Sequence, residues 1–240
     1  MDKLPASDIK VEGKVFKWLD NYWYHYKWPT LIAAFFLVAF LVMGLQMCSS
    51  EKTDVYIIYA GPYGFEGSAA ADFASEVNTV ANAGRDKKLS CDTVDFYILS
   101  EEQINAEKAA AEEKGEVYYY NSQFFAEEKR KFEQLIFAGE YSICLLDPAI
   151  YENIKESGGF RALSEVFETI PDAAFDEYGI RLADTGFARY FTNASGLPED
   201  TMLCLRREST MSFLNRSRAE EQYALYVEVF KKIAEFKIPE

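Results

Sequence analysis

The feature that most constrains this chain is an uncharged, apolar run of 18 residues, Thr30 to Met47, with the sequence TLIAAFFLVAFLVMGLQM. A helix of about 20 apolar residues is long enough to cross the hydrocarbon core of a bilayer. A cleaved signal peptide has an apolar region of about 7 to 15 residues close to the start of the chain, whereas 29 residues precede this run. We therefore predict a retained transmembrane helix over residues 30–48, which divides the chain into a segment 1–29 and a domain 49–240.

Lysines flank the apolar run unevenly, and this asymmetry predicts its orientation. Lysine precedes the run at positions 10, 14, 17 and 27, and stands alone just after it at position 52, beside acidic residues. Because cytoplasmic flanks carry the excess of Lys and Arg, we predict a single-pass protein of the cell membrane with a cytoplasmic N-terminus and an extracytoplasmic C-terminal domain. The lysines before the run alternate with Trp and Tyr, which is typical either of a segment that lies in the membrane interface or of a plain orientation signal.

The predicted extracytoplasmic segment is strongly acidic. The chain has 25 Lys and Arg and 39 Asp and Glu; residues 1–50 hold five and four of these, which leaves 20 basic and 35 acidic residues, a net charge of −15. Such a surface repels phosphate backbones and anionic headgroups, so no nucleic-acid partner is expected. Acidity also keeps a domain soluble, and that simpler explanation stays open.

Histidine and cysteine exclude several classes of enzyme. The single histidine, His25, precedes the apolar run, so the C-terminal domain can form no Ser-His-Asp triad, no Cys-His dyad and no histidine-bound zinc site. Cys91, Cys144 and Cys204 lack the spacing of a CxxC motif or of a small disulfide framework. The last two stand in apolar, strand-like runs, where cysteine behaves as a small buried hydrophobe. We predict three buried free thiols, no metal site and no cofactor.

Apolar runs alternate with helical patterns throughout the C-terminal domain. The predicted strands are 54–60, 92–100, the run that ends at Asp147, and 201–207, with a short strand at 117–120. The predicted helices are 66–83, a polar surface helix capped by Ser100, a long helix capped by Asn121 or Ser122, a helix from Pro148 to Gly158, and 216–236. Residues 172–191 are predicted to be irregular. This alternation predicts an α/β fold with a mostly parallel sheet and helices on both faces, preceded by one transmembrane helix.

Three motifs in this alternation carry a resemblance to a known family. A strand-helix-strand start is followed by an amphipathic helix that ends in AGEYSICLLDP and then by a helix that ends in GGFRAL. In this order they resemble the first lobe of the extracellular solute-binding proteins of bacterial ABC transporters, which are type 2 periplasmic-binding-protein-like, over Val55 to Val166. The resemblance implies binding without catalysis. The domain is too short for a full second lobe, so the resemblance implies a reduced solute-binding-like fold, in which a second lobe of reduced size stays open.

A candidate ligand site follows from the predicted fold. Open α/β sheets bind ligands beyond the carboxyl ends of their strands, where polar and aromatic loop residues converge. The residues predicted to do so are Gly61, Tyr63, Asn121, Asp147 and Tyr151. The two tyrosines would stack on a sugar or a peptide. Asp147 has a second interpretation, because Asp followed by proline also caps a helix without any ligand.

Three functions stay open at this point. The first hypothesis is a membrane-anchored, non-catalytic binding or sensing module that is held in the membrane by Thr30 to Met47 and binds a small molecule or an envelope protein. The second is a structural or assembly partner in a cell-envelope complex. The third is a hydrolase that uses carboxylates alone, for which the chain offers no recognisable motif.

Overall fold

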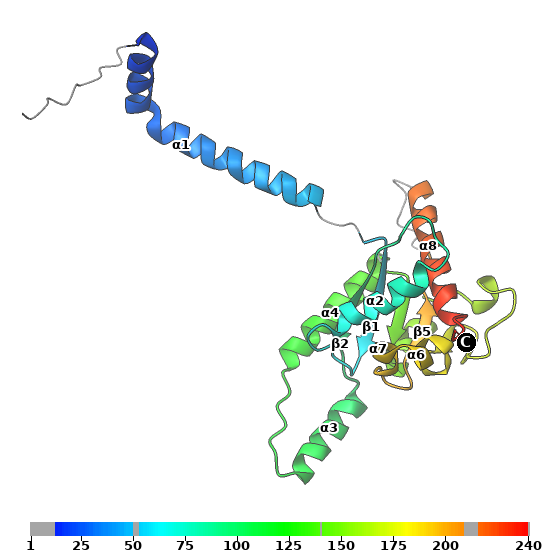
Figure 1. Ribbon diagram of the computed structural model, residues 1–240. Coiled ribbons are helices and arrows are strands. Elements are labelled where there is room, and N and C mark those ends of the chain that lie inside the picture. Colours follow the sequence, from blue (N-terminus) through cyan, green and yellow to red (C-terminus); the bar gives the residue numbers. More distant parts are fainter. Residues whose placement is uncertain (1–12, 50–52, 140, 209–215, 240) are drawn as a thin grey trace, which may run out of the picture. The chain divides into compact units, whose positions relative to one another are not determined.

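The computed structural model describes residues 13–49, 53–139, 141–208 and 216–239 (Figure 1). They form two compact units, Met1–Glu51 and Lys52–Glu240. In chain order the elements are α1 Lys14–Ser49, β1 Val55–Gly61, α2 Ala69–Ala81, β2 Cys91–Tyr97, α3 Glu101–Glu113, α4 Ser122–Ala138, β3 Ile143–Leu146, α5 Pro148–Glu156, η1 Leu163–Glu165, β4 Gly179–Arg181, η2 Leu182–Asp184, α6 Gly186–Tyr190, α7 Thr192–Ser195, β5 Met202–Leu205 and α8 Arg216–Ala234.

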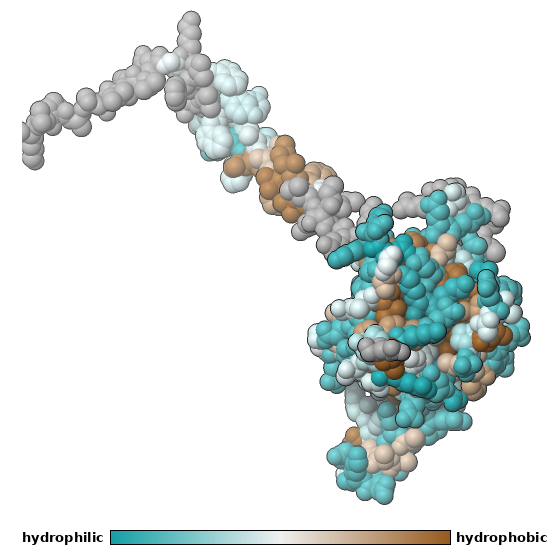
Figure 2. Space-filling view, turned by 45° about the vertical axis from the view of Figure 1, so that its right-hand side comes forward, coloured by the Kyte–Doolittle hydropathy of each residue, from teal (hydrophilic) through white to brown (hydrophobic). Residues whose placement is uncertain are grey.

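The N-terminal unit is the single helix α1. Its stretch Asn21–Gly44 is 24 residues long and apolar enough to cross a membrane, and Figure 2 shows the apolar side chains as a brown band. The prediction of one helix of this kind is confirmed. Pro29 lies well inside α1, because the aromatic residues before it are helical too. Trp18, Tyr22 and Tyr26 stack at four-residue intervals, with ring centroids 5.6 and 5.3 Å apart.

The C-terminal unit is built on a five-stranded sheet with the order β2-β1-β3-β5-β4. β1 pairs in parallel with β2 and β3, whereas β5 pairs antiparallel with both β3 and β4. The α/β fold is therefore confirmed, but the predicted mostly parallel sheet is a mixed one. The reason is that an apolar run such as that of β5 predicts a buried strand but not the direction in which the strand runs.

Side chains alternate between the two faces of the sheet and build two cores. On one face, Ile57 and Leu145 pack in a cluster with Phe73 of α2 and Phe230 of α8. The other face of β1 and β3 packs in a second cluster with α4 and α5. Helices thus cover both faces. Cys91, Cys144 and Cys204 are buried free thiols, as predicted.

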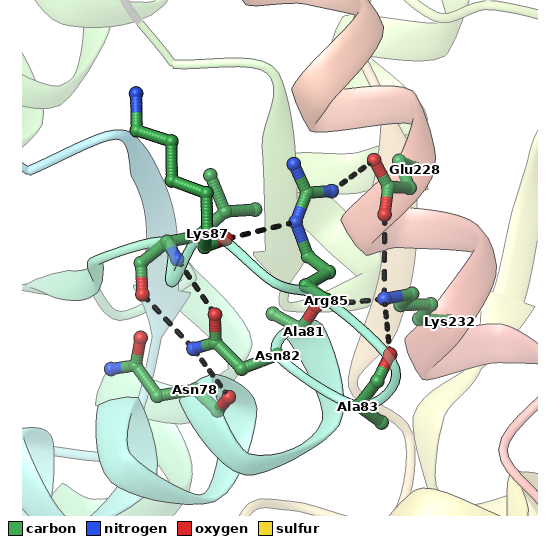
Figure 3. A network of polar contacts seen from close by, with 9 residues as sticks. Asn78, Ala81, Asn82, Ala83, Arg85, Lys87, Glu228 and Lys232 are labelled. Carbon is green, nitrogen blue, oxygen red and sulfur yellow. Dashed lines mark hydrogen bonds and ion pairs between the residues drawn. The ribbon is translucent and has the colours of Figure 1, made fainter.

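A polar network fastens α8 to the end of α2 (Figure 3). The Lys232 ammonium donates hydrogen bonds to the carbonyls of Ala81, at 2.8 Å, and Ala83, at 3.1 Å. Glu228 forms ion pairs with Arg85 and, at 3.3 Å, with Lys232. The last carbonyls of a helix have no partner within it, so the side chains of α8 complete the C-terminus of α2.

Two segments differ from the predictions. Residues 117–120 form no strand; Val117 is 93% exposed, and the Tyr118 hydroxyl donates to Glu107 at 2.9 Å. Together with α3 they project away from the sheet as an arm, so no neighbouring strand can pair with them (Figure 1). Residues 172–191, predicted as irregular, contain β4 and α6. A strand of three residues is too short to show a period, and it is held by its pairing with β5.

Candidate functional site

Gly61 and Asp147 meet at the carboxyl ends of β1 and β3, where the sequence placed a ligand site. The Asp147 amide donates to the carbonyl of Ala60 at 2.9 Å, and the carboxylate-bearing residue is only 7% exposed. A Cβ on Gly61 would lie 2.7 Å from the Tyr59 hydroxyl and 3.2 Å from the Asp147 Cβ. Glycine is therefore needed here for close packing of the protein with itself.

Both carboxylate oxygens of Asp147 are occupied by the protein. Oδ1 accepts a hydrogen bond from the amide of Ala149 at 2.9 Å and so caps α5. Oδ2 accepts from the Gln103 side-chain amide at 2.8 Å, while the Oε1 of the same Gln103 accepts from the Ser100 amide at 2.8 Å. The Ser100 hydroxyl completes this capping box by accepting from the Gln103 amide. Asp147 therefore joins the starts of α3 and α5.

Of the other three predicted site residues, Tyr63 shares the neighbour Tyr59 with Gly61, because its amide donates to the Tyr59 hydroxyl at 3.1 Å, whereas Asn121 and Tyr151 have separate surroundings. The Tyr63 ring packs edge-on against Tyr59 and against Phe65, with centroids 6.2 and 5.2 Å apart. Asn121 is exposed and caps α4. Tyr151 is 1% exposed; its hydroxyl donates to Asp176 at 2.6 Å. Burial, followed by that hydrogen bond, raises the pKa of Tyr151. Tyr151 is a core residue that holds Asp176, so it does not join Gly61 and Asp147.

A different concavity lies on the sheet face that α4 and α5 cover. It is a groove with a cavity volume of about 610 Å³, within the range of about 300 to 1,000 Å³ that is typical of small-molecule sites. Its walls come from both helices and from the segments at their ends. The lining residues include Phe132, Glu133, Ile136, Ile150, Ile154 and Arg206. We refer to this space as the α4–α5 groove.

Arg206 brings a cation to this groove. It follows β5 directly, and strand alternation puts it on the same face as Met202 and Cys204, which belong to the core under α4 and α5. Its Nε and Nη1 atoms are buried and have no hydrogen-bond partner among the residues that the structure describes. Burial lowers the pKa of Arg206, which expresses the cost of removing a guanidinium from water.

The sequence reasoning did not single out Arg206. The run LCLRR contained a usable signal, since Cys204 and Arg206 are two residues apart in a strand and so share a face. An arginine on a face that is otherwise apolar needs an anion, polar partners or water. This requirement of Arg206 is stronger evidence for a site in the groove than the predicted loop residues are for a site at the carboxyl edge of the sheet.

Comparison with known proteins gives no further guide to the site. No protein-family model matches the chain, and neither a curated protein nor a solved structure matches it significantly. Within residues 13–49, 53–139, 141–208 and 216–239, no group of three or more His, Cys, Asp and Glu side chains is placed to hold a metal ion. The groove is thus the strongest candidate site on geometric grounds.

Proposed function

We propose that this protein is a membrane-anchored, extracytoplasmic binding module without catalytic function, and that its ligand lies in the α4–α5 groove. The observation that carries the proposal is that Arg206, a half-buried residue whose Nε and Nη1 have no hydrogen-bond partner among the described residues, lines a largely apolar cavity of about 610 Å³. Small-molecule sites typically combine apolar walls with a few polar groups that fix orientation. The resemblance to the first lobe of solute-binding proteins is part of this proposal.

The groove supports the proposal better than the carboxyl edge of the sheet does. At the edge, the Asp147 carboxylate already caps α5 and holds Gln103. The same residue is only 7% exposed, so little of its carboxylate is accessible to a ligand. In the groove, Arg206 is a half-buried cation whose Nε and Nη1 have no partner in the described part of the chain, so an anion beside it would meet an incompletely paired guanidinium.

The binding proposal is tested on the full-length protein in nanodiscs of zwitterionic lipid. Amide hydrogen exchange is measured with sugars, amino acids, peptides and organic acids in separate samples. A ligand in the groove should slow exchange in residues 129–137 and 149–157, because binding to the folded state suppresses its opening. Asn153→Trp places a large ring at an exposed position that lines the groove and should abolish this protection. Glu152→Trp, at an exposed position beside the groove lining, is the matched control and should retain it.

The proposed orientation has its own test. In intact cells, protease added from outside should digest the C-terminal unit and spare residues 1–29. Replacing Lys10, Lys14, Lys17 and Lys27 by glutamine should weaken that asymmetry, because cytoplasmic lysines set the direction of insertion. Complete protection of the C-terminal unit in cells with a permeable outer barrier would contradict the orientation.

A second candidate function is a partner in an envelope assembly, and the arm formed by α3 and residues 114–121 favours it. Every residue of α3 is at least partly exposed, and Tyr119, in the segment that follows α3, is 86% exposed. In Figure 2 the arm carries apolar patches among its polar atoms. A photo-crosslinking residue at position 119 should capture a stoichiometric partner in cells, whereas one at Tyr190, which is also exposed, should not. Equal capture at the two positions, or none, would contradict an assembly role for the arm.

A further inference from the structure

Arg206 is fixed in position by its backbone. Its amide donates to the carbonyl of Ser142 at 2.8 Å, and its carbonyl accepts from the Tyr223 hydroxyl at 2.7 Å. These bonds tie the residue to the edge of β3 and to α8. The backbone from which the Arg206 side chain reaches the wall of the groove is therefore fixed before any ligand arrives.

Several groups around Arg206 affect the charge that a ligand could carry. Glu133, Glu101 and Lys129 also line the groove, so its charged lining is balanced, with two cations and two anions. The groove lining includes residues from the last turns of both helices, Ile136 of α4 and Ile154 of α5, and Ile154 lies against Gly159. A helix C-terminus opposes an anion by about 0.3 to 1 kcal/mol. A direct hydrogen bond between charged groups contributes about 1.5 to 3 kcal/mol, so contact with the guanidinium outweighs that opposition.

The rest of the lining selects the kind of molecule. Phe132, Ile136, Ile150 and Ile154 offer apolar surface to a hydrocarbon or aromatic group. The C-terminal unit has a strongly negative sequence, which disfavours a polyanion such as a phosphate dianion. One guanidinium suits one planar carboxylate, which it can bind through two parallel N–H donors.

We propose that the α4–α5 groove binds an organic monocarboxylate with an apolar body, and that Arg206 holds its carboxylate. The apolar body lies between Phe132 and Ile136 of α4 and Ile150 and Ile154 of α5. This inference rests on the proposed binding function and adds the chemical class of the ligand. Its central claim is that the acid group, and not merely the apolar body, determines the affinity.

The test uses three compounds that share one body and differ in the head group: phenylbutyrate, phenylbutanol and phenylbutylamine. Each is titrated at neutral pH against the full-length protein in zwitterionic nanodiscs, and protection of residues 129–137 and 149–157 from hydrogen exchange gives the affinity. Phenylbutyrate should bind at least about tenfold more tightly than phenylbutanol, which is about 1.4 kcal/mol. Phenylbutylamine should bind more weakly than phenylbutanol.

Arg206→Met is the decisive variant, because methionine keeps an unbranched apolar side chain and removes the charge. It should bind phenylbutyrate and phenylbutanol within about threefold of each other, which is less than 1 kcal/mol. Arg189→Gln removes an exposed guanidinium on α6, away from the groove lining, and should keep the wild-type preference.

Each other outcome overturns a stated part of the reasoning. Equal affinity of the acid and the alcohol in the wild type would refute the role of Arg206 while leaving a binding groove in place. Absence of protection by all three compounds would refute the proposed function as well. A large fall in the thermal midpoint of Arg206→Met without ligand would show that the guanidinium already has a structural partner, and that result would also overturn the inference.

Discussion

Replacement of Asp147 by alanine is expected to destabilise the C-terminal unit by about 2 to 4 kcal/mol. Loss of the side chain that caps α5 costs about 1 kcal/mol. The second carboxylate oxygen accepts from Gln103, and a hydrogen bond to a charged group contributes about 1.5 to 3 kcal/mol. The two losses fall on one small network, so their sum is an upper range and not a strict total.

Asparagine at position 147 separates the two contributions. Asn caps a helix as well as Asp does, so the bond from Ala149 survives. Its amide nitrogen would then face the Gln103 nitrogen, and Gln103 cannot rotate its amide without losing the bond from the Ser100 amide to its Oε1. We expect Asp147→Asn to cost about 1 kcal/mol, clearly less than Asp147→Ala.

The assay is chemical denaturation of the full-length protein in nanodiscs. Tryptophan fluorescence is unsuitable, because Trp18, Trp23 and Trp28 all belong to α1. Exposure of the buried thiols of the C-terminal unit to a maleimide dye reports its unfolding, in a background where Cys48 is replaced by serine. A cost below about 0.5 kcal/mol for Asp147→Ala, or equal costs for alanine and asparagine, would refute the capping account. Loss of ligand protection at unchanged stability would identify Asp147 as a ligand residue instead.

Three further predictions follow from buried or paired groups of the same unit. Tyr151→Phe removes the hydrogen bond to Asp176 and should lower the free energy of unfolding by about 1.5 to 3 kcal/mol in the same denaturation assay, whereas a loss below about 0.5 kcal/mol would contradict it. Burial raises the pKa of Cys91 to about 11 and raises the pKa of Cys204 well above its ordinary value. Maleimide should therefore label both thiols only after denaturation, because the thiolate is the reactive form. Rapid labelling of the folded protein would count against their burial. The pKa of Glu228 is lowered from 4.5, chiefly by its hydrogen bond with the arginine in Figure 3. The pairing of Glu228 therefore stabilises the fold above pH 4.5, and this stabilisation is lost as the pH falls through the lower pKa of the folded state. The thermal midpoints of wild type and Glu228→Gln should differ at pH 7 and converge at acidic pH.

Local signals in the sequence were sufficient for most of the helices and for the apolar helix α1. Ser100 was predicted as a cap, Asn121 as a cap with Ser122 as the alternative, and Asp147 as a cap or a ligand residue. The side chains of Ser100, Asn121 and Asp147 each accept a backbone hydrogen bond at the start of a helix. These motifs can be read from the sequence because a cap and the amide it satisfies are two or three residues apart. The free energy involved is local, so no knowledge of the tertiary structure is needed.

The direction of β5 and the existence of β4 could not be read in the same way. β4 is three residues long, and its partner β5 lies more than 20 residues away in sequence. An apolar run such as MLCL predicts a buried strand but contains no information about whether its neighbour runs parallel or antiparallel. The prediction of a mostly parallel sheet extended the parallel arrangement of the first three strands to β5, which runs antiparallel to its neighbours.

The position of the candidate site depends on that same reversal. Had β5 run parallel to β3, the residue after it would have stood at the carboxyl edge, near Asp147 and Gly61, where the sequence placed a ligand. In the antiparallel register Leu205 lies opposite Ile143, the first residue of β3, so Arg206 emerges at the other edge and pairs with Ser142. Its side chain then faces the helices of that layer instead of the loops beyond the strands. The α4–α5 groove therefore contains the Arg206 guanidinium because one strand of the sheet is reversed, and a rule for parallel sheets could not have found it.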